Sequence, residues 1–277
     1  MHVDANQGGL MSLIFEKKEG VAYITLNRPE ARNALDAASV VELVRAWEEY
    51  RDDDDLRCAV ITGTGDESFC AGADLRRLIP LFTGSRKAQT EAERQVQADP
   101  LMVQKAWLRD LDIYKPIVAG VNGHAIAGGL ELLYAADIRI AAAGAKFGLQ
   151  EVKWGLFPMG GSSVKLPRQI PYARAMEMML TGELIDAEDA LALGLINRLV
   201  PREKVMEECE RMARIIVQNA PLAVSAVKKA VMTNTGLTLE QGLKNEFELA
   251  VPVFMSQDAQ EGPKAFKEKR KPRFKGK

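Results

Sequence analysis

The segment from Ile117 to Asp137 constrains the fold of this chain more than any other stretch. An apolar run typical of a strand leads into Asn122-Gly123, then into Gly128-Gly129, and finally into a helical pattern from Leu130 to Ala136. A strand, a glycine turn and a helix start in this order present unpaired backbone N–H groups at the positive end of a helix, where anions bind. Because Gly128 has no Cβ, a ligand oxygen can approach its amide closely.

Strands alternate with helical patterns over most of the chain. Strands are expected at Val21 to Leu26, Cys58 to Thr62, Pro116 to Val121 and Asp137 to Ala142. Asp36 is placed to cap a helix whose apolar positions run to Trp47. The alternation indicates an α/β fold rather than a β-sandwich or a helical bundle.

The predicted organisation has three parts: a flexible leader at residues 1–12, an α/β core at 13–200 and a helical region at 201–277. Beyond Tyr172 the pattern predicts helices only. One of them is short, capped by Asp186 and ended by Gly194.

Composition excludes several classes of function. The formal net charge of −1 argues against nucleic acid as the main partner. Because the chain has two histidines and three scattered cysteines, neither a metal cluster nor a Ser-His-Asp triad is expected, and no metal is predicted. No apolar run approaches the roughly 20 residues of a membrane span, and the polar start lacks a signal-peptide core. A reducing, cytoplasmic setting and no membrane partner are therefore expected.

Two glutamates lie in glycine-bearing surroundings. Glu131 follows Gly128-Gly129 within the first helical turn, and Glu151 stands between Gly148 and the Gly160-Gly161 pair. Two carboxylates beside bare backbone amides suit acid–base chemistry at an oxyanion. The alternative is that the glycines serve only tight packing and that Glu131 is a favourable charge at a helix N-terminus.

A second source of amides is the segment Phe69 to Leu75. Gly72 and its small neighbours Ala71 and Ala73 permit close backbone approach, and Ala73 can offer a second N–H. Cys70 is a poor candidate nucleophile, because no histidine other than His124 could serve as its base.

The tail from Lys264 to Lys277 holds eight Lys or Arg residues and one acid, Glu268. It is interpreted either as a solvated, partly frayed terminus or as a basic clamp for a phosphorylated ligand.

These motifs, taken in order, resemble the enoyl-CoA hydratase/isomerase (crotonase) superfamily over nearly the whole chain. The stretches that carry the resemblance are Asn27-Arg28-Pro29, Arg32-Asn33-Ala34-Leu35, Phe69 to Leu75, Lys115 to Asp137, Phe147-Gly148, Pro158-Met159-Gly160-Gly161, Ala187 to Val200 and Ala265 to Arg270. The resemblance implies an α/β crotonase-like spiral of ββα turns with a helical C-terminal region that mediates assembly into a homotrimer or a dimer of trimers.

The resemblance also implies roles for individual residues. Glu131 and Glu151 match the two catalytic glutamates of hydratases, with Glu151 as proton donor to the α-carbon and Glu131 as base for water. Ala73 and Gly128 match the two N–H donors to the thioester oxygen. The residues implied to contact coenzyme A are Arg28, Arg32, Ala71, Asp74, Phe266 and Lys269.

Two departures from well-known hydratases concern the acyl end. Gln150 stands where those enzymes carry Pro, and Pro158-Met159-Gly160-Gly161 is one residue shorter than their loop. Both departures bear on acyl preference more than on reaction type. Candidate walls of the acyl pocket, each weighed against plain core packing, are Leu78, Leu81, Phe82, Trp107, Trp154 and Phe157.

The preferred hypothesis is hydration of the double bond of a 2-enoyl-CoA to a 3-hydroxyacyl-CoA, as in fatty acid β-oxidation. An enoyl-CoA isomerase or a carnitinyl-CoA-type dehydratase is the alternative, and an acyl-CoA or RNA binding protein is a third reading. No separate cofactor is expected, because coenzyme A enters as part of the substrate.

Overall fold

The computed structural model describes residues 11–109 and 111–277. The predicted leader, residues 1–12, lies outside the described residues except for its last two. No helix in those two ranges is both long and apolar enough to cross a bilayer.

The main sheet has six strands in the order β1-β2-β3-β5-β7-β10. Its strands are β1 (Leu13–Lys18), β2 (Val21–Leu26), β3 (Cys58–Gly63), β5 (Ile117–Val121), β7 (Ile138–Ala142) and β10 (Arg198–Val200). β1 pairs antiparallel with β2, and every other neighbouring pair is parallel. The four strands expected from the sequence are confirmed.

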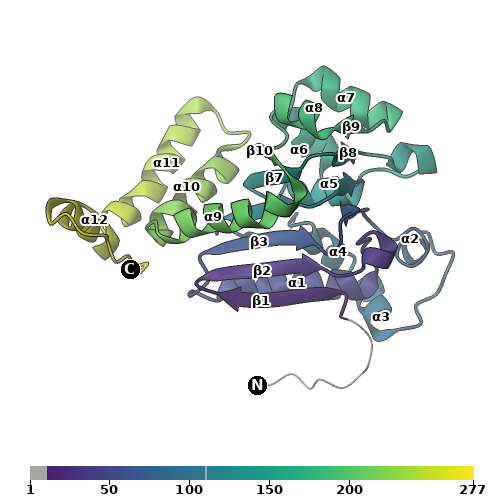
Figure 1. Cartoon of the computed structure of the whole chain (residues 1–277), viewed down its shortest axis with the longest axis horizontal. Helices are drawn as coiled ribbons and strands as arrows, with labels where there is room; N and C mark the ends of the chain where they lie inside the picture. The colour runs from purple at the N-terminus through teal and green to yellow at the C-terminus, as the bar shows by residue number, and fades with distance from the viewer. Residues whose placement is uncertain (1–10, 110) are drawn as a thin grey trace.

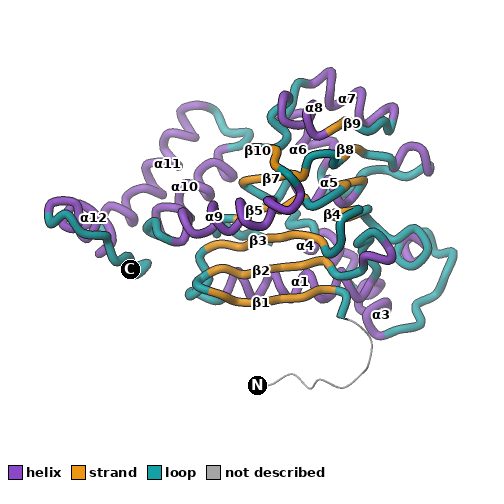
Figure 2. Tube along the Cα trace, in the orientation of Figure 1, coloured by secondary structure: helices purple, strands orange, loops and turns teal. Residues whose placement is uncertain are grey.

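A second sheet of four short strands runs beside the first, in the order β4-β6-β8-β9. Its strands are β4 (Ser68–Cys70), β6 (His124–Ile126), β8 (Lys146–Gly148) and β9 (Ile185–Asp186). β3, β5 and β7 are each followed directly by β4, β6 and β8, so each turn of the chain adds one strand to each sheet. This confirms a crotonase-like spiral of ββα turns (Figures 1 and 2).

Helices connect and cover the strands (Figure 1). They are α1 (Ala37–Asp52), α2 (Ile79–Phe82), α3 (Glu91–Ala98), α4 (Pro100–Ala106), α5 (Gly128–Leu133), α6 (Ser162–Gln169), α7 (Tyr172–Thr181), α8 (Ala187–Ala192), α9 (Val205–Val217), α10 (Pro221–Asn234), α11 (Leu239–Phe254) and α12 (Gln257–Lys267), with 3₁₀ turns η1 (Pro29–Ala31), η2 (Glu151–Trp154) and η3 (Arg202–Lys204). Asp36 caps α1 as predicted, since its carboxylate accepts from the Ser39 N–H at 3.0 Å.

The main sheet is buried on both faces, which accounts for its nearly continuous apolar strands. Ala22, Ile24 and Ala59 face the larger core, which α1 covers, whereas the alternating residues Val21 and Cys58 pack with α9. Because side chains alternate along a strand, each strand contributes to two cores at once.

The prediction of helices only beyond Tyr172 is wrong at β9 and β10. β10 pairs in parallel with β7, and β9 pairs antiparallel with β8. Strands of two or three residues show no period-2 pattern, so only their tertiary partners define them. Asp186 occupies the N-cap position of α8 but gives the helix no side-chain hydrogen bond. Its carboxylate lies 3.0 Å from Lys146 Nζ instead.

The C-terminal helices α10, α11 and α12 extend away from the two sheets (Figure 1). Neither α10 nor α11 has a buried side chain. The large apolar residues exposed there are Leu222, Val227, Val231, Met232, Leu237, Leu239, Leu243, Phe247, Val251 and Phe254. Exposed apolar surface of this extent is typical of an interface between proteins.

Candidate active site

Glu131 is placed by the glycine pair that opens α5. A Cβ on Gly129 would lie 2.6 Å from the carbonyl carbon of Cys70, so only glycine lets α5 begin directly against the end of β4. The first turn of α5 thereby carries the Glu131 side chain inside the molecule, where only 4% of the residue is exposed.

The carboxylate of Glu131 is held by groups at the start of α6. Ser162 donates to Glu131 Oε1 through its hydroxyl at 2.7 Å and through its backbone N–H at 3.3 Å. Gly160 packs on the same carboxylate, because a Cβ there would lie 2.6 Å from Glu131 Cδ. Burial raises the pKa of Glu131, and the hydrogen bonds from Ser162 and Gly160, together with the charge of Arg109, oppose that rise.

Glu151 begins the 3₁₀ turn η2 and is 9% exposed. Its Oε2 atom is buried and has no hydrogen-bond partner within the described ranges. Burial, and then the negative charge of Glu131, raise the pKa of Glu151 to about 7. The two glutamates predicted from sequence therefore share one low-dielectric site, and their different surroundings separate their acidities.

Two backbone amides meet beside this pair. Gly72 has φ of +89°, and a Cβ on it would lie 2.7 Å from the Gly128 nitrogen, which brings the segment around Ala73 against the start of α5. Leu35 fixes that segment by donating to the Gly72 carbonyl at 2.8 Å and accepting from Asp74 at 2.9 Å. The N–H groups of Ala73 and Gly128 have no protein acceptor in the described part of the chain. Two unsatisfied donors side by side are what an oxyanion hole requires.

Trp107 packs against Gly128 and donates a hydrogen bond to its carbonyl. Its Nε1 donates to the Gly128 carbonyl at 2.6 Å, and a Cβ on Gly128 would lie 2.8 Å from its Cζ2 atom. The side chain is buried in the larger core. Sequence reasoning placed Trp107 among the acyl-pocket walls and missed this contact, which no local pattern 21 residues away could reveal.

The other candidate walls fall into two groups. Leu78 and Leu81 are buried in the core, whereas Phe82, Trp154 and Phe157 are exposed. Trp154 ends η2, which Glu151 begins, and Phe157 follows three residues later. These two aromatic residues therefore lie close after Glu151 along the chain, and their place in an acyl pocket stays a prediction.

Arg28 makes several contacts inside the molecule. Its guanidinium donates to the Ala34 carbonyl at 2.5 Å and lies 3.1 Å from Asp74 and 3.4 Å from Asp36. These contacts bury the side chain and hold the Asp36 and Asp74 segments together. The contact of Arg28 and Asp74 with coenzyme A stays a prediction.

Arg32 and Ala71 stay available at the surface. The Arg32 side chain is exposed and pairs with Glu67 at 2.7 Å. Ala71 donates to the Arg32 carbonyl at 3.0 Å, while its own carbonyl accepts no backbone hydrogen bond from the described residues. Arg32 and Ala71 thus lie together next to the segment that contains Gly72 and Ala73, and their contact with coenzyme A stays a prediction.

The helix α12 lies at the far end of the molecule from α5 (Figure 1). Phe266 is 87% exposed near the end of α12, and Lys269 follows that helix by two residues. The contact of these two residues with the nucleotide of coenzyme A stays a prediction.

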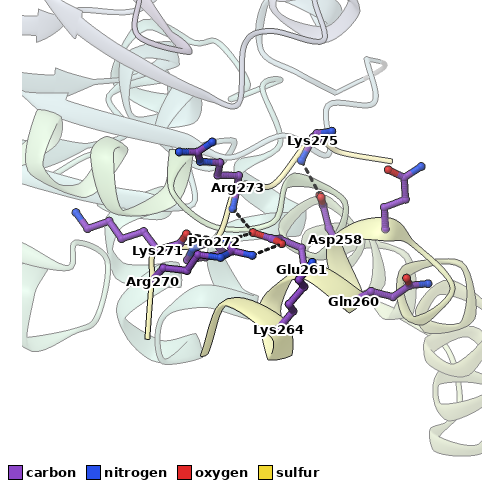
Figure 3. Close-up of a pocket in the computed structure, with 10 residues that line it drawn as sticks. Asp258, Gln260, Glu261, Lys264, Arg270, Lys271, Pro272, Arg273 and Lys275 are labelled. Carbon is purple, nitrogen blue, oxygen red and sulfur yellow. Dashed lines mark hydrogen bonds and ion pairs between the residues drawn. The ribbon is translucent and has the colours of Figure 1, made fainter. Parts of the chain in front are cut away.

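The basic tail is ordered rather than frayed. It returns along α12 and encloses a cavity of about 960 Å³ (Figure 3). Glu261 accepts from the Arg270 guanidinium and from the Arg273 N–H at 2.8 Å, and Asp258 accepts from the Lys275 N–H at 2.7 Å. Arg57 of the core donates to the Phe274 carbonyl at 3.0 Å. The tail is therefore fastened to α12 and to the core.

Other chemistry finds little support at this site. Burial raises the pKa of Cys70 to about 12, so its thiol stays protonated and is a poor nucleophile. No cluster of three potential metal-ligating side chains occurs within residues 11–109 and 111–277. The arrangement supplies two carboxylates of different acidity and a pair of free amides.

Comparison with known proteins agrees with this architecture. The family model described as Enoyl-CoA hydratase/isomerase matches residues 16–277. The chain is 39% identical over 261 residues to enoyl-CoA hydratase EchA19 of Mycobacterium tuberculosis, covering 94% of this chain and 95% of that protein. It is 39% identical over 270 residues to a carnitinyl-CoA dehydratase of Citrobacter koseri, covering 96% and 98%. The crystal structure of an enoyl-CoA hydratase from Mycobacterium tuberculosis matches with a TM-score of 0.85 and 37% identity, covering 96% of this chain and all of that one. The chain therefore belongs to the enoyl-CoA hydratase/isomerase family.

Proposed function

We propose that the protein adds water across the double bond of a 2-enoyl-CoA to give a 3-hydroxyacyl-CoA. The observation that carries this proposal is the burial of Glu131 and Glu151 in one site beside the free N–H groups of Ala73 and Gly128. Hydration needs a base for water, an acid for the α-carbon and donors for the thioester oxygen, and this site offers all three.

The two glutamates divide the proton transfers between them. Glu131 is held by donors that favour its charged form, so it is the base that removes a proton from water as the oxygen bonds to C3. Glu151 has a pKa of about 7 and so carries a proton for part of the time near neutrality, which it delivers to C2. The hydroxyl of the water is thus added at C3 and the proton of Glu151 at C2. Glu131 then loses to solvent the proton it took from water, and Glu151 regains one, so that the net addition is one water.

The amides of Ala73 and Gly128 stabilise the negative charge that builds on the thioester oxygen between these two transfers. The loss of one such donor typically costs roughly 3 kcal/mol of transition-state stabilisation. Ala73 belongs to the segment clamped by Leu35, and Gly128 is fixed by Trp107, so neither donor has to reorganise during the reaction.

The reverse reaction, dehydration of a 3-hydroxyacyl-CoA, uses the same groups with their roles exchanged. The similarity to a carnitinyl-CoA dehydratase makes this direction the second candidate. Isomerisation of a 3-enoyl-CoA would need only one carboxylate to shuttle a proton, so the presence of two favours hydration or dehydration.

Assembly into homotrimers, or pairs of them, completes the proposal. The apolar faces of α10 and α11 have no partner in the described chain, and α12, which contains Phe266 and precedes Lys269, lies at the far end of the molecule from α5 (Figure 1). A neighbouring subunit would cover these apolar faces, and Phe266 and Lys269 would contact the coenzyme A bound to that subunit.

The test is the loss of the conjugated-thioester absorbance when purified protein meets an enoyl-CoA. Glu131→Gln and Glu151→Gln are each expected to lower kcat by about 10²–10⁴-fold, the range for acid–base catalysis. Both variants should still bind the CoA ester. Full activity in either variant would contradict the two-glutamate mechanism.

A further inference from the structure

The hydroxyl of Ser162 joins two groups that lie on the same helix. Ser162 is fully buried at the start of α6, and its Oγ lies 2.7 Å from Glu131 Oε1 and 3.4 Å from the Tyr134 hydroxyl. Glu131 lies in α5 and Tyr134 is the C-cap residue of that helix, three residues further on. The contact therefore ties the start of α6 to the catalytic face of α5.

The direction of these hydrogen bonds follows from counting protons. A serine hydroxyl has one proton to give, and a carboxylate can only accept it. Ser162 donates to Glu131 at 2.7 Å and has a longer contact of 3.4 Å in which Tyr134 is the acceptor, so its single proton goes mainly to the carboxylate. Burial raises the pKa of Tyr134 far above its ordinary value, so this phenol stays neutral. The short hydrogen bond from Ser162 therefore ends on Glu131 Oε1, with an uncharged phenol beside it.

We propose that Ser162, with Tyr134 behind it, is a positioning residue that keeps Glu131 ionised and turned toward the reacting water. The inference rests on the function proposed above and assigns neither residue a contact with substrate. With Oε1 occupied by Ser162, Oε2 is the oxygen left to accept the proton of water.

The charges around Glu131 explain why its ionised form needs a hydrogen bond from Ser162. The charged or titratable groups that face Glu131 are Glu151 from η2, Tyr134 from α5, Arg109 after α4 and Lys165 from α6. Glu151 and burial oppose ionisation of Glu131. Arg109 and Lys165 favour it, but Arg109 donates to the Met159 carbonyl rather than to the carboxylate. Ser162 supplies the side-chain hydrogen bond that holds the orientation.

The unequal treatment of the two glutamates supports the proposal. Glu131 has the Ser162 hydroxyl and N–H, whereas Glu151 has a buried oxygen without a partner. Donors to a carboxylate lower its pKa, and burial without donors raises it. The Ser162 hydroxyl therefore contributes to the separation between base and acid on which the reaction depends.

The experiment compares the pH dependence of kcat/KM for the wild type, Ser162→Ala, Ser162→Thr and Tyr134→Phe. Ser162→Ala should move the acidic limb upward by about 1 pH unit, because it removes a charge-assisted hydrogen bond. It should also lower kcat by about 10-fold through misorientation. Ser162→Thr keeps the hydroxyl and should restore the wild-type limb, while Tyr134→Phe removes only the longer contact in which Tyr134 accepts and should not move the limb upward. Ser163→Ala, on the exposed neighbour in the same turn, is the matched control and should change nothing.

A second readout does not depend on activity. The C=O stretch of protonated Glu131, identified by its absence in Glu131→Gln, can be titrated by infrared difference spectroscopy. An upward shift in Ser162→Ala supports the proposal, even if the wild type hydrates none of the enoyl-CoAs offered and the proposed function fails. Identical pH profiles and identical titration in the wild type and Ser162→Ala would overturn it. Should Ser162→Ala fail to fold, a folded Ser162→Thr that is inactive while Glu131 titrates as in the wild type would do the same.

Discussion

The indole Nε1 of Trp107 donates to the carbonyl of Gly128 at 2.6 Å and so holds the residue whose own N–H is proposed to bind the thioester oxygen. The ring also fills the space that a Cβ on Gly128 would need. Trp107 thus restricts the position of Gly128 from a segment far away in sequence.

Trp107→Phe should retain the fold and lose activity. Phenylalanine keeps most of the buried apolar contact but cannot donate to Gly128, so the amide is less firmly placed. We expect kcat to fall by about 10-fold, with a smaller change in KM, because the interaction matters most in the transition state. Steady-state kinetics with circular dichroism as a folding control checks this. An unchanged kcat would show that Gly128 is held without the indole.

Glu151→Gln should stabilise the protein at alkaline pH. The pKa of Glu151 is raised from 4.5 to about 7 in the folded state, so the free energy of unfolding falls as the pH rises from about 4.5 to about 7. Glutamine removes that penalty, which is on the order of 3 kcal/mol above pH 7.

Thermal unfolding at pH 5 and pH 8 measures this effect. The Tm of Glu151→Gln should exceed that of the wild type by several degrees at pH 8 and by much less at pH 5. An equal difference at both pH values would mean that burial does not raise the pKa of Glu151 as described.

Substitutions of Arg32 and Arg28, which both lie near the segment that contains Ala73, are expected to have different effects on substrate binding and on stability. Arg32→Ala is expected to raise KM for CoA esters several-fold with kcat nearly unchanged, because Arg32 is exposed and the change removes uniform binding. Arg28→Ala removes the cation beside Asp74 and one of the two cations beside the buried Asp36, and should destabilise the fold by about 3 kcal/mol.

Denaturant unfolding and initial-rate kinetics on both variants separate these outcomes. Normal stability with weakened CoA-ester binding in Arg28→Ala would restore the CoA contact that the family resemblance implies for this residue.

The parts of the fold that depend on local chemistry could be predicted from the sequence. The glycines at 128 and 129 predicted a helix start with free amides, and the structure has α5 beginning there because a side chain at 129 would collide with Cys70. Long apolar runs such as Ile117–Val121 predicted strands correctly, since they are buried on both faces.

The parts that depend on contacts between distant residues could not be predicted from the sequence. β9 and β10 are too short to show a period and exist only because β8 and β7 pair with them. Ser162 and Trp107 reach the site through contacts 31 and 21 residues apart, which no spacing rule marks. The burial of Arg28 became visible only with its acidic partners in place.

The measurement that tests the central claim most directly is isotope incorporation from H₂¹⁸O during turnover of a 2-enoyl-CoA. Purified protein should produce a 3-hydroxyacyl-CoA that carries one ¹⁸O at C3, and Glu131→Gln should produce almost none. Turnover that yields a rearranged enoyl-CoA without ¹⁸O would contradict the account and point to an isomerase.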